Sequence, residues 1–195
     1  MLQQWFISGL ISGANPQQRE VALLSAVQRR IAVPQVVTAA RGLSHFGEHA
    51  LGWLVLGALG ALIDRRRRRD WLAAAATVAA AHGTSIAVKR VVRRQRPTDP
   101  SVTVLAGTPS QLSFPSSHAA STTAAAILYG GLLRRRLTPA LVPPMLISRL
   151  VLGVHYPTDV LMGSALGAVI GAGTRRRLRG RMRGAGSGAG EGVKQ

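Results

Sequence analysis

Residues 43–69 read LSHFGEHALGWLVLGALGALIDRRRRR, an apolar stretch that ends in five consecutive arginines. The part from Leu43 to Ile63 is about 20 residues long, which is the length that an α-helix needs to cross a bilayer. A block of arginines directly after such a stretch is typical of the cytoplasmic end of a membrane helix. The stretch therefore predicts a spanning helix with a basic cytoplasmic turn behind it.

The composition of the whole chain agrees with a membrane protein. Its 195 residues are 47% hydrophobic and have a mean hydropathy of +0.18, yet the formal net charge is +18. Basic proteins that bind nucleic acid are usually hydrophilic, so we expect no nucleic-acid partner. The length allows one domain of ordinary size. The absence of cysteine excludes disulfides, thiolate zinc sites and cysteine nucleophiles.

Four further apolar stretches follow the first one: residues 71–88, 117–133, 139–154 and 158–174. Helices of a soluble bundle show a polar face, and residues 73–81 and 160–172 show none. We therefore predict an all-α fold, a polytopic membrane helix bundle of about five spanning helices. Residues 17–32 carry Val21, Leu24, Val27 and Ile31 on one stripe and predict an additional amphipathic helix on the membrane surface.

These elements suggest three parts of the chain. Residues 1–42 form an N-terminal segment with the surface helix, and their first 13 residues are too short to span and lack the basic start of a signal peptide. Residues 43–174 form the membrane core. Residues 175–195 are basic and rich in glycine, so we expect a disordered tail there.

The arginine blocks predict the orientation in the plasma membrane. With five spans, the blocks at 65–69, at 134–136 and from 175 onward lie on the same side. The positive-inside rule places that side, and the C-terminus, in the cytoplasm. Residues 89–116 and 155–157 then lie on the extracytoplasmic face.

The first of three candidate segments on that outer face is residues 89–97. Lys89 and Arg96 are seven residues apart, which is two helical turns, so we expect them on one helix face. Pro97 favours the end of the helix near that point. Taken alone, this segment also fits a basic collar that contacts lipid headgroups.

The second segment is residues 114–118. Ser116 is suited to cap the following helix, whose first amide groups would then form an anion site at the positive end of the helix dipole. His118, in the first turn, could donate a proton to a bound anion. The alternative is a plain serine cap with an incidental histidine.

The third segment is residues 148–159. Pro157 marks the start of a new helix, so Asp159 lies in its first turn and can reach back to His155. A carboxylate on one imidazole nitrogen leaves the other free as a nucleophile. Arg149 is close enough in sequence to meet an anion bound there. The alternative is an interface histidine with a capping aspartate.

Together the three segments resemble, in order, the signature motifs of the type 2 phosphatidic acid phosphatase (PAP2) superfamily. The matching pattern is Lys89-x6-Arg96-Pro97, then Pro115-Ser116-Ser117-His118, then Ser148-Arg149-x5-His155-x3-Asp159. The family fold implies six helices, with residues 17–32 as the sixth.

The resemblance implies roles in phosphate binding. Lys89, Arg96 and Arg149 would clamp the phosphate oxygens and offset charge in the transition state. Ser116 and the amide of Ser117 would bind a nonbridging oxygen. The family usually has glycine where Ser117 stands, a change that a residue in the first turn of a helix tolerates.

The resemblance also implies the catalytic roles. His155 would attack phosphorus and become phosphohistidine, while Asp159 holds its imidazole. His118 would protonate the leaving alkoxide and then activate water. The family carries out this chemistry without a metal or another cofactor.

A site formed by helix ends at a membrane surface favours a lipid phosphate as substrate. The chain is similar to the small PAP2 enzymes of GC-rich bacteria with arabinan-bearing walls, which implies the 5-phosphate of decaprenylphosphoryl-5-phosphoribose. Undecaprenyl pyrophosphate and a glycerophospholipid phosphate are the alternatives. Arg90, Arg93 and Arg94 lie outside the motif positions and have no assigned role.

Two other function classes stay open on sequence alone. His45, Glu48 and His49 match H-x-x-E-H, a zinc protease pattern, although Gly47 weakens the helix that the pattern needs. We expect instead that these three side chains line the mouth of the phosphatase site. The remaining alternative is a non-enzymatic membrane protein that binds anionic lipid, which would show salt-sensitive binding and no turnover.

Overall fold

The structure is a computed structural model that describes residues 15–187. Its helices are α2 (Pro16–Ile31), α3 (Pro34–Gly47), α4 (Leu51–Ile63), α5 (Arg68–Val92), α6 (Ser117–Leu132), α7 (Thr138–Val151) and α8 (Pro157–Ser187), with short 3-10 turns η1 (Glu48–Ala50) and η2 (Arg65–Arg67). The extended elements in the described range amount to one isolated bridge between Gln95 and Leu112. The predicted all-α fold is confirmed.

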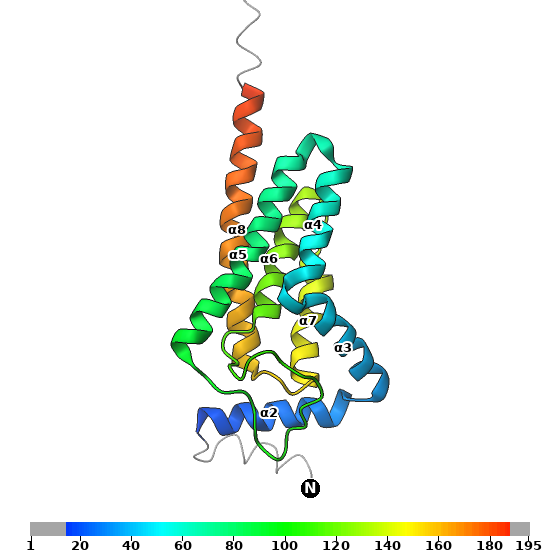
Figure 1. The fold of residues 1–195 in the computed structure, drawn as a ribbon, viewed down its shortest axis with the longest axis vertical. Helices are drawn as coiled ribbons and strands as arrows, with labels where there is room; N and C mark the ends of the chain where they lie inside the picture. The colour runs from blue at the N-terminus through cyan, green and yellow to red at the C-terminus, as the bar shows by residue number, and fades with distance from the viewer. Residues whose placement is uncertain (1–14, 188–195) are drawn as a thin grey trace, which may run out of the picture.

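The long helices form an upright bundle, and α2 lies across one end of it (Figure 1). The long loop between α5 and α6 is at that same end, whereas the turn between α4 and α5 is at the opposite end (Figure 1). The predicted N-terminal helix at residues 17–32 is therefore present and packs against α7 and α8.

Helix α6 lies at the centre of the bundle and contacts α4, α5, α7 and α8. Most of its first two turns consist of alanine, serine and threonine, which allow neighbouring helices to approach closely. Gly163 and Gly167 of α8 use this space, because a Cβ at either position would overlap the carbonyl oxygen of Ser116 or Ala120. This close packing places the start of α8 directly beside the start of α6.

Aromatic side chains hold α4 and α5 against α6. The hydroxyl of Tyr129 donates to the Trp53 carbonyl at 2.8 Å, and Nε1 of Trp53 donates to Oγ1 of Thr122 at 3.1 Å. The ring of Trp71 lies 5.4 Å from the ring of Tyr129, centroid to centroid. These polar tips are satisfied inside an apolar cluster, as buried tyrosine and tryptophan require.

The first predicted span is not one continuous helix. Helix α3 begins at Pro34, earlier than expected, because proline suits the first helical position. It ends at Gly47, and the chain turns through His49 (φ 50°) and Ala50 (φ 60°) before α4 begins. Left-handed backbone at two non-glycine residues is unusual, and it sharply redirects the chain.

Two other boundaries differ from the prediction. Helix α5 ends at Val92, because Arg93 adopts a left-handed conformation (φ 53°), so Arg96 does not share a helix face with Lys89. Helix α8 continues to Ser187, past the expected end at residue 174. The predicted disordered tail therefore overlaps a helix in its first part, while residues 188–195 and residues 1–14 lie outside the described range.

Two helical stretches are long and apolar enough to cross a membrane, Pro34–Ile63 and Arg65–Val92, while Thr138–Val151 is apolar but shorter. The other helices of the bundle run beside them (Figure 1). Large apolar side chains such as Leu51, Val55 and Leu62 of α4 are more than half exposed, which suits contact with lipid. The exposed apolar side chains of α4 thus contrast with α6, most of whose residues are buried.

Candidate active site

The three sequence motifs meet at the end of the bundle where α2 lies. They border a cavity of about 830 Å³, whose lining includes Lys89, Arg96, Ser117, His118, Arg149 and His155. These residues come from α5, the loop after it, α6, α7 and the turn before α8. The structure thus brings the predicted residues to one place from segments far apart in the chain.

His155 is held in a tight turn between α7 and α8. Gly153 has φ 68°, and a Cβ there would meet the carbonyl oxygen of Thr103, so the turn requires glycine. Pro157 then starts α8, which places Asp159 in its first turn. His155 is 3% exposed and Asp159 fully buried, with Nδ1 of the imidazole 3.5 Å from Oδ2 of the carboxylate. This is an ion-pair distance; Nδ1 has no hydrogen-bond partner within the described residues.

The other imidazole nitrogen of His155 faces cations. Its Nε2 lies 3.4 Å from Nη1 of Arg96. Because a guanidinium only donates hydrogen bonds, this contact places the lone pair of the imidazole on Nε2. Burial, and then the charges of Arg96, Lys89 and Arg149, hold the pKa of His155 well below its usual value of 6.5. The imidazole is therefore neutral at physiological pH, as a nitrogen nucleophile must be.

Arg149 is buried to 2% exposure and borders the same cavity. Its Nη1 donates to Oγ of Ser44 at 3.1 Å, and its Nε to Oγ of Ser148 at 3.3 Å. Nη2 has no partner in the described part of the chain. A buried guanidinium nitrogen without a partner, beside an open cavity, is suited to bind an anionic oxygen.

Arg96 reaches the site from the loop rather than from a helix. Its Nε donates to the carbonyl of Ser110 at 2.7 Å, and Nη1 donates to the carbonyl of Val154 at 2.6 Å. Residues 94–96 pair with residues 111–113 through backbone hydrogen bonds, which fix this part of the loop. Burial lowers the pKa of Arg96 to about 10, so its charge is still present at neutral pH.

Lys89 makes more structural contacts than a simple phosphate clamp would. Its Nζ donates to the carbonyls of Ser113 at 2.8 Å and Pro115 at 2.7 Å, with a longer contact to Leu112 at 3.4 Å. These bonds occupy the donors of the ammonium group and fix the loop that leads into α6. Lys89 thus adds positive charge to the site while it anchors the loop.

The two serines at the start of α6 have different roles. Ser116 caps the helix, accepting from the amide of Ala119 at 3.5 Å, and is fully buried. Ser117 lines the cavity, and its hydroxyl accepts a hydrogen bond from Ser85 at 2.7 Å. Of the two serines predicted as phosphate ligands, Ser117 is the one that borders the cavity.

His118 lies against helix α3. Its Nε2 is 3.0 Å from the carbonyl oxygen of Ser44, so this nitrogen carries a proton and Nδ1 is left for exchange. A Cβ at Gly47 would lie 2.7 Å from Cδ2 of His118, so glycine leaves room for the ring. Ser44 therefore contacts both His118 and Arg149, a role that the sequence patterns did not indicate.

His45, Glu48 and His49, which the sequence predicts at the mouth of the site, line the same cavity. Nδ1 of His45 is 3.7 Å from Oε2 of Glu48, and the ring of His49 is 6.3 Å from that of His82. The zinc protease pattern needs one continuous helix, and α3 ends between its two histidines. Within residues 15–187, no three histidine, cysteine or acidic side chains are placed to hold a metal ion.

Known sequences match most of the chain. The model of the PAP2 superfamily matches residues 70–183. The decaprenylphosphoryl-5-phosphoribose phosphatase of Mycobacterium tuberculosis is 56% identical over 150 residues, which cover 76% of this chain and 85% of the relative. The protein of the same name from Mycolicibacterium smegmatis is 56% identical over 145 residues, which cover 74% and 81%.

Solved structures share the fold at lower identity. A transmembrane PAP2 type phosphatidylglycerolphosphate phosphatase from Bacillus subtilis superimposes with a TM-score of 0.73 at 22% identity, over 91% of this chain and 93% of that one. Aquifex aeolicus LpxE superimposes with a TM-score of 0.65 at 19% identity, over 80% and 93%. At these identities the likeness concerns the fold alone.

Proposed function

Because the chain belongs to the PAP2 superfamily and is an integral-membrane lipid phosphatase, we propose that its substrate is decaprenylphosphoryl-5-phosphoribose, from which it removes the 5-phosphate. The proposal rests on relatives that carry this activity in their names and are 56% identical over about three quarters of the chain. In this role the enzyme would act in the synthesis of a cell-wall arabinan precursor.

The observation that carries the reaction type is the shared cavity of His155 and Arg149. Nε2 of His155 points toward the cations, and Nη2 of Arg149 has no partner within the described residues. A phosphate between them would satisfy the arginine and present its phosphorus to the imidazole. Arg96 and Lys89 add positive charge from two other sides of the same cavity.

In the first step, Nε2 of His155 forms a bond to phosphorus while the bond from phosphorus to the ester oxygen breaks. The negative charge of the bound phosphate favours the protonated form of His118, and the leaving alkoxide takes the proton from Nδ1, because Nε2 of that ring is held by Ser44. Asp159 stabilises the positive charge that develops on the His155 ring. The product is a phosphohistidine and a lipid alcohol.

In the second step, neutral His118 accepts a proton from water, and the resulting hydroxide attacks the phosphohistidine. The nitrogen–phosphorus bond breaks, inorganic phosphate leaves, and His155 returns to its neutral form. Arg149, Arg96 and the amide end of α6 near Ser117 stabilise the phosphoryl oxygens in both steps. After one turnover His118 is protonated again and His155 is neutral, and one water molecule has been consumed to split the ester into the lipid alcohol and inorganic phosphate.

We also propose that the site opens on the extracytoplasmic face. In Figure 1 the turn between α4 and α5 is at the end of the bundle opposite α2 and the loop between α5 and α6, and Arg96 reaches the site from that loop. Arginines 65–69 lie at the turn between α4 and α5, and arginines 134–136 lie at the turn between α6 and α7. Both blocks are at the end opposite the site, and the positive-inside rule supports a cytoplasmic location for that end. The lipid tail would then lie in the outer leaflet while the phosphoribose enters the cavity.

The test is phosphate release by the purified protein in detergent. The substrates are decaprenylphosphoryl-5-phosphoribose, undecaprenyl pyrophosphate and phosphatidic acid, and His155→Ala is the control. We expect the highest kcat/KM on the phosphoribose lipid, no release by His155→Ala, and no effect of EDTA. A higher kcat/KM on either of the other two lipids would overturn the proposed substrate. Phosphate release by His155→Ala would overturn the proposed role of His155 as the nucleophile.

A further inference from the structure

We propose that Arg94 is a positioning residue that, held by Glu20 of α2, fixes the carboxylate of Asp159 and thereby orients the imidazole of His155. Helix α2 then belongs to the catalytic arrangement. The inference deepens the proposed function, because it depends on His155 as the nucleophile. It also assigns a role to one of the three arginines that the motifs leave unexplained.

Arg94 contacts Asp159 directly. Its Nη1 donates to Oδ1 of Asp159 at 2.9 Å and to Oγ1 of Thr158 at 2.7 Å. Its Nη2 forms an ion pair with Glu20 of α2. The guanidinium also lies 4.0 Å above the centre of the Tyr156 ring. Arg94 is thus held on several sides while it binds the carboxylate.

The two oxygens of Asp159 have different partners. Oδ2 accepts from the amide of Tyr156 at 2.8 Å and faces His155, whereas Oδ1 faces Arg94. Without Arg94, Oδ1 loses its charged partner, and the bond from the Tyr156 amide to Oδ2 holds the carboxylate less firmly. Because Asp159 is fully buried, an uncompensated charge there is also costly. Arg94 therefore controls both the direction and the charge of the group behind the nucleophile.

Glu20 connects this pair to α2. Its Oε1 accepts from the backbone amide of Thr158 at 2.9 Å, while Oε2 pairs with Arg94. The side chains of Arg94 and Glu20 are 24% and 13% exposed, so water screens their pairing less than it screens a surface salt bridge. One carboxylate of α2 thus holds both the first turn of α8 and the arginine that reaches Asp159.

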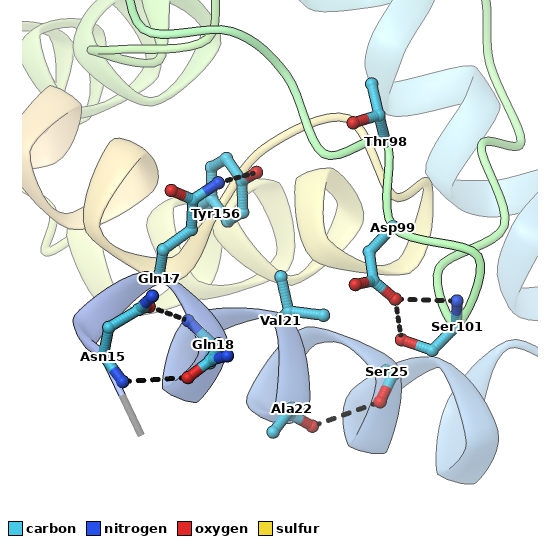
Figure 2. A pocket seen from close by; sticks show the side chains of 10 residues that line it. All are labelled: Asn15, Gln17, Gln18, Val21, Ala22, Ser25, Thr98, Asp99, Ser101 and Tyr156. Carbon is cyan, nitrogen blue, oxygen red and sulfur yellow. Dashed lines mark hydrogen bonds between the residues drawn. The ribbon is translucent and has the colours of Figure 1, made fainter. Parts of the chain in front are cut away.

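Further contacts fasten α2 at both of its ends. Near its start, Nε2 of Gln17 donates to the hydroxyl of Tyr156 at 3.4 Å, in a second cavity of about 590 Å³ between α2 and residues 98–101 (Figure 2). Near its other end, Nε2 of Gln28 donates to the carbonyl of Val151 at 3.0 Å. The segment that carries His155 is therefore bracketed by α2.

The experiment compares Arg94→Gln with Arg93→Gln, a matched control one residue away whose side chain, within residues 15–187, bonds only the Arg90 carbonyl. We expect Arg94→Gln to lower kcat by about 10-fold or more, because a small misplacement of a reacting group can cost up to about 100-fold in rate, with KM nearly unchanged. Arg94→Lys should restore part of kcat. Glu20→Gln should lower kcat in the same direction, and the Glu20→Gln/Arg94→Gln double variant should lose less than the sum of the two single losses.

A pH profile separates positioning from a general loss of structure. Charged or titratable groups around His155 are Arg96 in the loop, Lys89 on α5, His118 on α6, Arg149 on α7 and Asp159 on α8. Removing Arg94 leaves more of the Asp159 charge to stabilise protonated His155. The acid limb of kcat/KM should therefore move to higher pH in Arg94→Gln and stay in place in Arg93→Gln.

Thermal unfolding in detergent, followed by tryptophan fluorescence, identifies variants that are folded. A folded Arg94→Gln variant with unchanged kcat and an unchanged acid limb would overturn the proposal, as would an equal loss in Arg93→Gln. If Arg94→Gln does not fold, the same criteria apply to Arg94→Lys and Glu20→Gln. Failure of the proposed function has a different signature, namely turnover by His155→Ala or another preferred lipid in the wild-type protein.

Discussion

Gly47 packs against His118 so closely that a Cβ at position 47 would lie 2.7 Å from Cδ2 of the imidazole. The contact joins the end of α3 to the first turn of α6. Because Ser44, in the preceding turn of α3, holds Nε2 of His118, any shift of the ring also affects that bond. The break between α3 and α4 thus bears directly on the site.

Gly47→Ala should therefore impair turnover without unfolding the protein. The methyl group must displace the His118 ring, and a small displacement of a catalytic group can cost about 100-fold in rate. Gly42→Ala is the matched control on the same helix, since nothing lies within 4 Å of a Cβ there. We expect kcat to fall in Gly47→Ala and to stay at the wild-type value in Gly42→Ala. Equal kcat in both variants would show that His118 tolerates the added methyl group.

Asp159→Asn tests the group behind the nucleophile. The amide keeps the shape of the carboxylate and loses the charge that stabilises protonated His155. In a comparable aspartate–histidine pair, this change lowers kcat by about 10⁴-fold, and we expect a loss on the order of 10²-fold or more. Phosphate release under saturating lipid measures kcat. A folded Asp159→Asn variant with more than half of the wild-type kcat would exclude this role.

The sequence predicted much of this arrangement, because helix periodicity and motif order act locally. Asp159 can be placed near His155 from four residues of spacing and one proline. Arg96 was misplaced, since the helix containing Lys89 ends at Val92 and a backbone pairing with residues 111–113 sets the loop. That pairing is a tertiary contact, and no spacing within residues 89–97 indicates it.

The sequence did not predict the contacts that site residues make with residues far away in the chain. Glu20 is separated from Thr158 by 138 residues, and Ser44 from Arg149 by 105, so neither contact has a signal in a single sequence. The broken helix at Gly47 was also missed, because an apolar stretch of spanning length favours one continuous helix. The left-handed turn at His49 and Ala50, which contacts α6, contains no glycine that would have indicated it.

The pH dependence should follow from His155. Burial and nearby cations hold its pKa well below 6.5, so the nucleophile stays neutral as the pH falls through 6.5. We therefore expect the acid limb of kcat/KM to lie below that pH. Arg96→Gln removes the cation nearest to the imidazole, which raises the pKa of His155 and moves the acid limb to higher pH. A limb that stays in place in Arg96→Gln would contradict this electrostatic account.

The proposed orientation can be tested with single cysteines, because the chain contains none. Pro100 lies in the loop beside the site, and Arg135 in the turn between α6 and α7, and both are exposed. In intact cells, a membrane-impermeant maleimide should label Pro100→Cys. It should label Arg135→Cys only after lysis. Labelling of Arg135→Cys in intact cells, with Pro100→Cys protected, would reverse the orientation.

A second phosphate distinguishes the proposed substrate from simpler lipid phosphates. Decaprenylphosphoryl-5-phosphoribose carries a phosphodiester to the polyprenyl chain in addition to the 5-phosphate. Arg41 of α3 and Arg90 of α5 line the same cavity as His155 and are exposed to it. We expect these two cations to attract the diester while the inner cations bind the 5-phosphate.

The Arg41→Gln/Arg90→Gln double variant should therefore raise KM for decaprenylphosphoryl-5-phosphoribose by about 10-fold or more, since a charged hydrogen bond contributes roughly 1.5–3 kcal/mol. Its kcat should stay close to the wild-type value, because neither residue touches His155 or Arg149. Phosphatidic acid has a single phosphate, so its KM should change by less than about twofold, the scale of a screened surface charge. An equal rise of KM on both lipids would instead mean that Arg41 and Arg90 attract any anionic lipid and do not read the second phosphate.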